Sequence, residues 1–438
     1  MDFEKKPMVD WYDPKQLAAT GIKTVVSTVF GNFADRREMQ AALDPGRGFY
    51  DYSDRKDIWL DYISDLGDGF NATYSVAHLL AKEQLELGGI QTKRGNILIM
   101  GGDEVYPTPE MEEYRNRLQG PYHAAFPKNN EDPDPPGLFV IPGNHDWYDG
   151  LTNFLKVFCQ NRSLGNWRTK QSRSYFAVKL PNNYWLIGID IQLNADIDVP
   201  QLNYFQNLAE KELKAKDKII LATAEPAWVY ESFDESNSSN KRLKFFINRI
   251  LKGETEDKTD PECYYKGKNK DIVITTILTG DLHHYSRYEE KVGPKETRQL
   301  ITAGGGGAFM HSTHSLNEKI NPSEGFDASF KKAFPSKSES LSLNNKNLLF
   351  FFHGPWMVLI LGLVHALSFY FLLIGGIQTE NFYITNSNPS GSALDLFDIA
   401  ILTPSVILLN LTFCLGIYMF TDFKSGNHKT ANKISGAV

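Results

Sequence analysis

Three short motifs contain residue types that could bind metal ions. They are Gly-Asp-Glu-Val-Tyr (102–106), Gly-Asn-His-Asp (143–146) and Gly-Asp-Leu-His-His-Tyr (280–285). Hydrolysis of a phosphate ester needs charge neutralisation on the phosphoryl oxygens and an activated water, which two divalent ions about 3.5–4 Å apart can supply. Such a centre needs a bridging carboxylate, further Asp, Asn or His ligands, and tight turns between them. The motifs therefore predict a metal-dependent phosphoesterase.

Each candidate ligand follows a segment that is typical of a β-strand. The pairs are Asp65 after Ile58–Ser64, Asp103 after Asn96–Met100, Asn144 after Leu138–Pro142, and Asp281 with His283 after Ile272–Thr279. Three of these five residues, Asp103, Asn144 and Asp281, directly follow a glycine, which permits a tight turn. One acidic turn after a strand would be ordinary, but four in succession favour a common site.

These strands must be held by a fold in which strands alternate with helices. Further strand patterns occur at Tyr184–Asp190, Lys218–Thr223 and Arg298–Thr302, and helical patterns occur at Ala72–Leu87 and Pro109–Leu118. This alternation predicts an α/β fold with helices covering its sheets. In such folds catalytic groups lie on loops just beyond the strand ends.

The stretch from Ile58 to His314 resembles the calcineurin-like metallophosphoesterases, a superfamily that includes the purple acid phosphatases. The motifs at 102–106 and 143–146 match the family patterns in full. The resemblance implies a β-sandwich flanked by helices. It also implies a dinuclear metal centre that activates water to hydrolyse a phosphoric mono- or diester.

The resemblance also assigns metal ligands by position. Asp103 would bridge the two ions, and Asn144 would bind the second ion. Asp65 and His283 would bind the first ion. Asp281 stands where the family has a histidine ligand, and we expect it to be a ligand as well.

The resemblance gives His145 a catalytic role and makes Asp146 its orienting partner. His145 would protonate the leaving oxygen or stabilise the phosphoryl charge. An imidazole bonded to a carboxylate keeps a defined tautomer and stays protonated more readily.

The segment that corresponds to the family's first motif, 64–68, departs from the family pattern, because Gly67 stands where a histidine is usual. Purple acid phosphatases also lack this histidine and use the tyrosine of the motif that corresponds to 102–106 as a ligand. Tyr106 is the corresponding residue, and Asp68 is an alternative.

The segment 222–226, which corresponds to the family's fourth motif, departs further. It has Ala224 in place of a ligand histidine, and Glu225 is a possible replacement. Carboxylates in place of imidazoles favour harder ions such as Mn²⁺ or Mg²⁺ over Zn²⁺. We therefore expect two divalent ions drawn from Mn, Fe, Mg or Zn, with Mn favoured and the second ion weakly held.

A glycine-rich segment, Ala303–Phe309, follows the motif at 280–285 in the sequence. It could cradle a phosphate through its backbone amides, or it could be a turn packed at a sheet edge. His311 and His314 follow it and are candidates for a role near the site. His284 is a weaker candidate, because strand alternation would point it away from the metal.

Bulk composition limits the function classes. The chain has 438 residues and a formal net charge of −7, which gives no support for nucleic-acid binding. Its three cysteines, Cys159, Cys263 and Cys414, match neither a disulfide framework nor a zinc spacing. No secretory signal is visible at the N-terminus.

Two uncharged stretches, Pro355–Ile374 and Ile399–Phe420, are each long enough to cross a bilayer. Lysines flank them on the outer sides, whereas the loop Gly375–Asp398 has no Lys or Arg. Because positive residues stay on the cytoplasmic side, the pattern predicts an integral membrane protein whose catalytic domain faces the cytoplasm.

The apolar residues between Leu17 and Phe33 recur at helical spacing. This helix could lie on a membrane surface or pack on the catalytic domain, and the mixed charges at 35–38 favour packing. The predicted organisation has five parts: an N-terminal helical segment (1–50), a metallophosphoesterase domain (51–330), a linker (331–346), a two-helix transmembrane hairpin (347–421) and a tail (422–438).

Two hypotheses follow from the sequence. The first is a membrane-anchored phosphoric ester hydrolase whose substrate could be lipid-linked. The second is a metal-binding or scaffold protein that has kept the fold and lost turnover, which the altered motifs at 222–226 and 280–285 suggest.

Overall fold

The computed structural model describes residues 2–11, 13–30, 48–191, 197–233, 239–253, 271–294, 296–320, 326–344, 355–384, 405 and 407–411. Contacts divide the chain into two units. The first comprises Met1–Val9 and Ala19–Leu341, and the second comprises Asp10–Ala18 and Ser342–Val438. Cys159 is a buried free thiol, whereas Cys263 and Cys414 lie outside the described residues.

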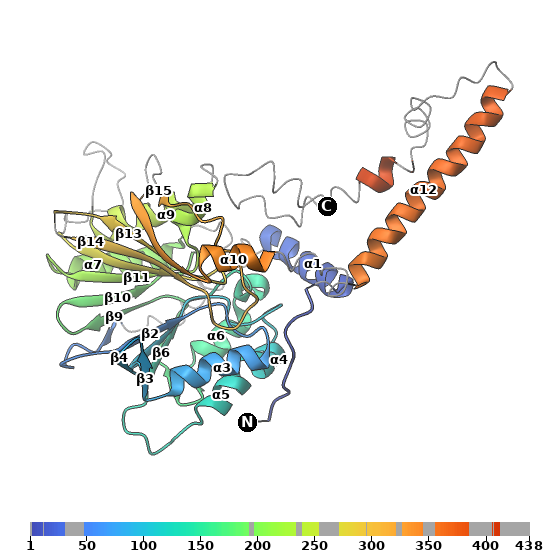
Figure 1. Ribbon diagram of the computed structural model, residues 1–438. Helices are drawn as coiled ribbons and strands as arrows, with labels where there is room; N and C mark the ends of the chain where they lie inside the picture. Colours follow the sequence, from blue (N-terminus) through green and yellow to red (C-terminus); the bar gives the residue numbers. More distant parts are fainter. Residues whose placement is uncertain are drawn as a thin grey trace. The chain divides into compact units, whose positions relative to one another are not determined.

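Two large β-sheets dominate the first unit (Figure 1). In order across the first sheet, the strands are β1 (Tyr50–Asp51), β9 (Phe176–Leu180), β10 (Tyr184–Gly188), β11 (Lys218–Ala222), β12 (Val273–Thr279), β14 (Thr297–Ala303), β13 (Tyr285–Lys291), β16 (Ala328–Phe334) and β15 (Lys319–Ile320). The second sheet has β2 (Leu60–Ile63), β5 (Ile97–Met100), β6 (Gly137–Val140), β8 (Trp167–Thr169) and β7 (Ser163–Leu164). β10, β11, β12 and β14 are mutually parallel, and so are β2, β5, β6 and β8.

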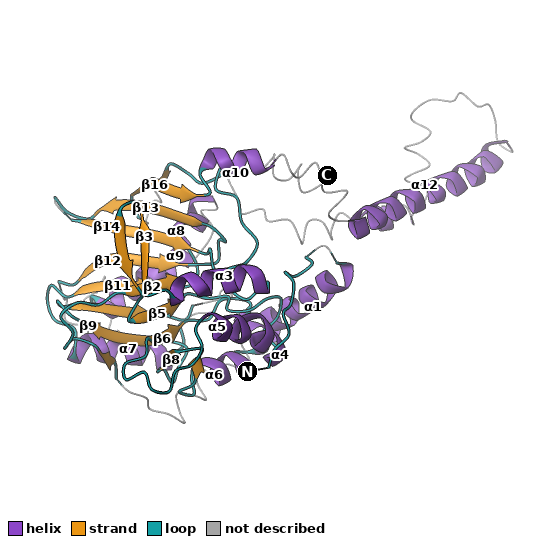
Figure 2. Cartoon of the chain, turned by 60° about the horizontal axis from the view of Figure 1, so that its bottom comes forward, coloured by secondary structure: helices purple, strands orange, loops and turns teal. Residues whose placement is uncertain are grey.

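The two sheets pack face to face, and helices cover their outer faces (Figure 2). Alternation along β5 shows the layering, because Ile97 and Ile99 belong to the core between the sheets, while Leu98 and Met100 pack towards helices. The helices on the second sheet are α3 (Phe70–Ala81), α5 (Gly120–Ala125), α6 (Thr152–Phe158) and the π-helix η2 (Tyr114–Gln119), which follows the short α4 (Met111–Glu113). This arrangement is a four-layered α/β sandwich.

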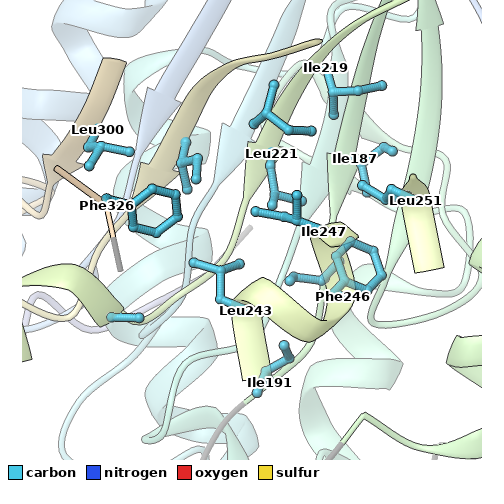
Figure 3. Close-up of a cluster of buried hydrophobic side chains, with 14 of the residues drawn as sticks. Ile187, Ile191, Ile219, Leu221, Leu243, Phe246, Ile247, Leu251, Leu300 and Phe326 are labelled. Atoms are coloured by element: carbon cyan, nitrogen blue, oxygen red, sulfur yellow. The ribbon is translucent and has the colours of Figure 1, made fainter. Parts of the chain in front are cut away.

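The outer face of the first sheet has the largest apolar core (Figure 3). Ile187, Ile219 and Leu221 of the sheet pack against Leu243 and Phe246 of the helices. The covering helices are α7 (Val199–Lys211), α8 (Ala227–Phe233), α9 (Ser239–Phe245) and η4 (Phe246–Leu251). The buried sheets form a rigid platform for the loops at their strand ends.

The seven predicted strands are confirmed as β2, β5, β6, β10, β11, β12 and β14. The predicted helix at 72–87 is wrong at its end, because α3 stops at Ala81 and a hairpin of β3 (Gln84–Leu87) and β4 (Ile90–Lys93) follows. Gly88 and Gly89 form the hairpin turn with φ of 58° and 80°. Such φ values suit a two-residue Gly-Gly turn, which overrides the helical pattern.

The N-terminal helix α1 runs from Pro14 to Phe30, as its spacing predicts. The predicted packing is made by a polar residue, because Lys23 forms an ion pair with Glu110. Ile22, Val25 and Val26 are exposed. Phe33 lies outside the described residues.

In the C-terminal part, α10 (Lys337–Asn344) is followed by the 30-residue helix α12 (Pro355–Ile384). The helical part of the first predicted span is therefore confirmed. Among the residues that the structure describes, no helix is both long and apolar enough to cross a membrane. The second predicted span, 399–420, lies outside the described residues except for 405 and 407–411.

Candidate metal centre

Loops after strands of both sheets bring the predicted ligands together. Asp65 follows β2 and Asp103 follows the neighbouring β5, while His283 follows β12 of the other sheet. All three are buried, and they offer ligand atoms that lie within 4.8 Å of one another. Sheet packing therefore places residues more than 200 positions apart in one candidate metal site.

Three aspartates of the site have left-handed backbone conformations. The φ values are 61° for Asp65, 53° for Asp103 and 67° for Asp281. Residues other than glycine rarely adopt this region, although aspartate tolerates it better than most. Strain of this kind persists where the surroundings enforce it, and it clusters at functional sites.

Tyr106 lies at the centre of the first group of ligands. Its hydroxyl is 3.0 Å from Asp103 Oδ2, 3.0 Å from His283 Nε2 and 3.3 Å from Asp65 Oδ1. The alternative residue, Asp68, accepts a hydrogen bond at Oδ1 from the backbone of Val9. Of the two candidates, the structure therefore brings Tyr106 to the other ligands.

A second group lies on the other side of Asp103. The turn that contains Asn144 encloses the Asp103 carboxylate, because the His145 backbone N–H donates to Asp103 Oδ1 at 2.9 Å. The Asn144 amide nitrogen donates to the Tyr148 hydroxyl at 3.1 Å, so its Oδ1 would be the ligand atom. Asn144 is thus placed beside the carboxylate that would bridge two ions.

Asp281 faces the same space. Its negative charge adds to burial in raising the pKa of Asp103, and it partly offsets the burial that lowers the pKa of His145. Its backbone N–H donates to Asp65 at 3.1–3.2 Å. The hydroxyl of Tyr230, from α8, donates to Asp281 Oδ2. Asp281 therefore lies close enough to Asp103 and His145 for its charge to act on both.

Ala224, which stands where the family has a ligand histidine, is buried and has no side-chain ligand atom. The suggested replacement, Glu225, accepts a hydrogen bond from Ser239 at 2.6 Å and is not part of the Asp65, Asp103 and His283 group. The expectation that Glu225 reaches inward has no support in this geometry.

The expected pairing of His145 with Asp146 is wrong. His145 Nδ1 lies 2.9 Å from the carbonyl oxygen of Pro107, which can only accept, so Nδ1 carries a proton. Asp146 instead accepts hydrogen bonds from the backbone of Gly143 and Glu104, at 2.9 and 3.2 Å. The buried carboxylate thus ties the Asn144 loop to the Asp103 loop.

The expectation that a carboxylate keeps His145 protonated is also wrong. Burial lowers the pKa of His145 to about 4, so the ring is neutral at pH 7 in the metal-free protein. Burial, followed by the charge on His311, also lowers the pKa of His283. A neutral His283 is the form that binds a metal ion.

The ionised forms of the buried carboxylates in the site are destabilised when no cation is bound. Burial raises the pKa of Asp103 to about 7 and that of Asp146 to about 8, and further negative charges add to both effects. Burial, then Asp103 and Asp281, raises the pKa of Asp65 as well. A divalent cation would offset this repulsion, so the donor set fits a metal ion.

The glycine-rich segment supports the Asp65 loop. The amides of Gly304, Gly306 and Ala308 donate to the backbone carbonyls of His284, Ser64 and Asp65 at 2.9–3.1 Å. A Cβ atom on Gly304 would lie 2.4 Å from Asp65 Oδ2. The phosphate-cradle interpretation is wrong for these three amides, and close backbone approach explains the glycines.

The three further histidines differ in position. His311 stacks on His283, with ring centroids 4.2 Å apart. His314 Nδ1 is 2.9 Å from the Ser340 hydroxyl, which places it in a contact with α10. His284 is buried and lies beside the backbone of His311. Of the three, His311 is the one that directly contacts a candidate ligand.

Two positioning groups were missed from the sequence, namely Tyr230 and the carbonyl of Pro107. No spacing in the sequence links Tyr230 to Asp281, because packing of α8 creates that contact. Pro107 follows Tyr106 directly, but a backbone carbonyl leaves no signal in residue type.

Neither a protein-family model nor a curated protein matches the chain. Among solved structures, it is similar to purple acid phosphatase PPD1 from yellow lupin (Lupinus luteus) seeds. The TM-score is 0.39 at 11% identity, over 64% of this chain and 48% of that one. It is also similar to PhoD, with a TM-score of 0.34 at 12% identity, over 57% of this chain and 56% of that one. The chain thus spans about half the length of each. Likeness at this level does not establish function, which rests on the site itself.

Proposed function

We propose that this chain is a metal-dependent phosphoric ester hydrolase of the calcineurin-like metallophosphoesterase type. The observation that carries the proposal is the Tyr106 hydroxyl lying within 3.3 Å of Asp65, Asp103 and His283. Four potential metal ligands converge there, three of which can be anionic. Burial of several potential anions in a protein core is costly, and a bound cation would offset this cost.

We assign the first ion to Asp65, Tyr106 and His283, and the second to Asn144 and Asp281, with Asp103 shared. When bound, two divalent ions neutralise charge on the phosphoryl oxygens and supply a nucleophile at neutral pH. The oxygen-rich donor set favours Mn²⁺ over Zn²⁺. The substrate would be a phosphoric mono- or diester.

His145 is the proposed acid for the leaving oxygen. The Pro107 carbonyl fixes the proton of the neutral ring at Nδ1, which leaves Nε2 to meet the substrate. A phosphate anion beside the ring favours its protonated form, because an opposite charge raises the pKa of a histidine. The ring could then donate from Nε2 to the oxygen that leaves phosphorus.

We further propose that the enzyme is membrane-anchored with its catalytic domain in the cytoplasm. The support comes from sequence: Pro355–Ile374 has no charged residue, and lysines flank the predicted spans only on their outer sides. A protease added to intact cells should then leave the catalytic domain whole. Digestion of that domain from outside would refute the orientation.

The second candidate function is a metal-binding or scaffold protein without turnover. Ala224 in place of a ligand histidine, together with the engagement of Asp281 by Tyr230, favours this alternative. A chain that binds one ion and hydrolyses nothing would match it.

The deciding experiment uses the full chain in detergent. Aryl phosphate mono- and diesters are incubated with the chain and Mn²⁺, Fe²⁺, Mg²⁺ or Zn²⁺ in turn, and bound metal is counted by elemental analysis. Turnover with at least one ion, lost in Asp103→Asn, is the expected result. Absence of turnover across all ions and both ester classes would refute the enzyme proposal.

A further inference from the structure

Large apolar side chains are exposed around the candidate metal centre. Six of them form what we call the apolar rim, with these exposed fractions: Ile22 66%, Val25 52%, Val26 48%, Phe309 38%, Met310 51% and Phe334 69%. A single exposed apolar residue on a protein surface is ordinary. Several around one site mark an interaction surface.

Polar contacts hold the α1 part of the rim beside the second group of ligands. Thr24 is hydrogen-bonded to the Tyr148 hydroxyl, which accepts from the amide of Asn144. One residue earlier, Lys23 forms an ion pair with Glu110 at 2.5 Å. These contacts use polar residues of α1 and leave Ile22, Val25 and Val26 exposed.

The other part of the rim lies beside the first group of ligands. The Phe309 carbonyl is 2.6 Å from His283 Nδ1, and the two rings are 4.6 Å apart. Met310 follows directly in the chain. Phe334 ends β16 opposite Tyr285, two residues after His283. The rim residues therefore flank the metal centre on two sides.

We propose that the apolar rim docks on the surface of a lipid bilayer, so that the metal centre receives phosphate esters carried by lipid headgroups. The substrate part of this inference rests on the proposed phosphoesterase function. In the reaction, water adds to phosphorus and the P–O ester bond breaks. The leaving oxygen takes a proton, which yields the lipid alcohol and phosphate.

A lipid occupant is favoured because a second exposed apolar segment follows later in the sequence. After Phe334 the chain forms α10, and ten residues (345–354) later it enters α12. The first twenty positions of α12 have no charged residue, and its described side chains include exposed Trp356, Leu363 and Phe369. A lipid phase accommodates both surfaces, whereas a protein partner would have to match each separately.

Depth labelling of the full chain tests docking without relying on catalysis. Single cysteines at Val25 or Met310 are labelled with nitrobenzoxadiazole, with Cys263 and Cys414 changed to serine and the buried Cys159 retained. The chain is bound to phosphatidylcholine vesicles that contain brominated lipid. Val292, a similarly exposed apolar residue at the far end of β13, is the matched control.

We expect brominated lipid to quench the rim labels at least about twofold more than the control label, because interfacial residues enter the acyl boundary. Equal quenching at all three positions would overturn the proposal. So would a rim label already shielded before vesicles are added, which would indicate that a second copy or another part of this chain covers the rim.

Turnover provides the second arm. In the double variant Ile22→Glu, Val25→Glu, the ratio of turnover on phosphatidic acid vesicles to turnover on a soluble aryl phosphate should fall about tenfold, because each buried methylene adds to membrane affinity. Val292→Glu should keep the ratio. An unchanged ratio in the double variant overturns docking at the rim. Failure to hydrolyse either substrate refutes the proposed function instead, and the labelling result still decides docking.

Discussion

The two halves of the candidate metal centre differ in how completely their potential metal ligands are assembled. In the first half, one tyrosine hydroxyl contacts both carboxylates and the imidazole, and all four side chains are buried. Their positions are fixed by strand ends and by left-handed turns. An ion would find this half preorganised.

The second half has fewer donors and looser support. Ala224 offers no ligand atom, and Asp281 shares its carboxylate with the Tyr230 hydroxyl. Asn144 is half-buried and is held through Tyr148. A site with fewer and less preorganised ligands binds a metal ion more weakly. We therefore expect the first ion to bind tightly and the second weakly.

In the proposed assignment, Asp103 serves both halves. Replacing the shared carboxylate by Asp103→Asn should abolish binding of the second ion and weaken the first. Turnover should fall at least about a thousandfold, since metal ions supply several kcal/mol of transition-state stabilisation. Steady-state rates and elemental analysis measure both effects. Asp217→Asn, which changes a buried carboxylate near the start of β11, is the control and should retain activity. Normal turnover in Asp103→Asn would dismiss the shared role.

Tyr106→Phe should damage the first half selectively. Loss of the hydroxyl removes the group that contacts Asp65, Asp103 and His283, and we expect about a hundredfold weaker binding of the first ion. Titration calorimetry with Mn²⁺ measures the change. Tyr288→Phe removes a buried hydroxyl that donates to the Asn317 carbonyl, and it should leave metal affinity intact. Unaltered affinity in Tyr106→Phe would count against tyrosine ligation.

Metal removal should destabilise the protein most at alkaline pH. The pKa of Asp103 is raised to about 7 in the folded, metal-free state, against 3.8 ordinarily. The folded state therefore binds this proton more tightly than the unfolded state, and the resulting stability is lost as pH rises through about 7. A bound ion replaces the proton and should add about 2.7 kcal/mol at a hundred times its Kd.

Thermal unfolding with and without EDTA measures this effect at about pH 5.5 and about pH 8, below and above the raised pKa. EDTA should lower the melting temperature at pH 8 and have a smaller effect at pH 5.5. An equal loss at both pH values would show that the carboxylates do not couple to the metal.

The first half of the site could be predicted from the sequence because its signals are local. Asp65, Asp103 and His283 each follow an apolar strand, and packed sheets bring the ends of such strands together. An α/β fold with helices covering its sheets was predictable for the same reason, since strand and helix periodicities alternate along the chain. The β-sandwich arrangement came from the family resemblance. Tyr106 needed the family pattern, because a tyrosine three residues after an aspartate is not informative alone.

The remaining features depend on packing between distant segments. Asp146 lies next to His145 in sequence, yet burial turns its carboxylate to backbone N–H groups of two loops. The end of α3 was missed because two glycines form a hairpin turn within an otherwise helical pattern. The exposed face of α1 was missed because periodicity predicts an apolar face but not what covers it.

The smallest effect is expected from the residue that supports Asp281. Tyr230→Phe removes the hydroxyl that donates to this carboxylate, and outer groups of this kind contribute about tenfold or more to metal affinity. We expect about tenfold weaker binding of the second ion, with the affinity for the first ion maintained because Asp65, Tyr106 and His283 are untouched. Titration with Mn²⁺ resolves the two steps, and Tyr204→Phe, which changes a hydroxyl bonded to the Ala177 backbone, is the matched control. Asp281→Ala should remove the second step altogether. If Tyr230→Phe instead strengthens binding of the second ion, the hydroxyl competes with that ion for Asp281. The low affinity of the second half would then come from this competition as well as from the missing imidazole.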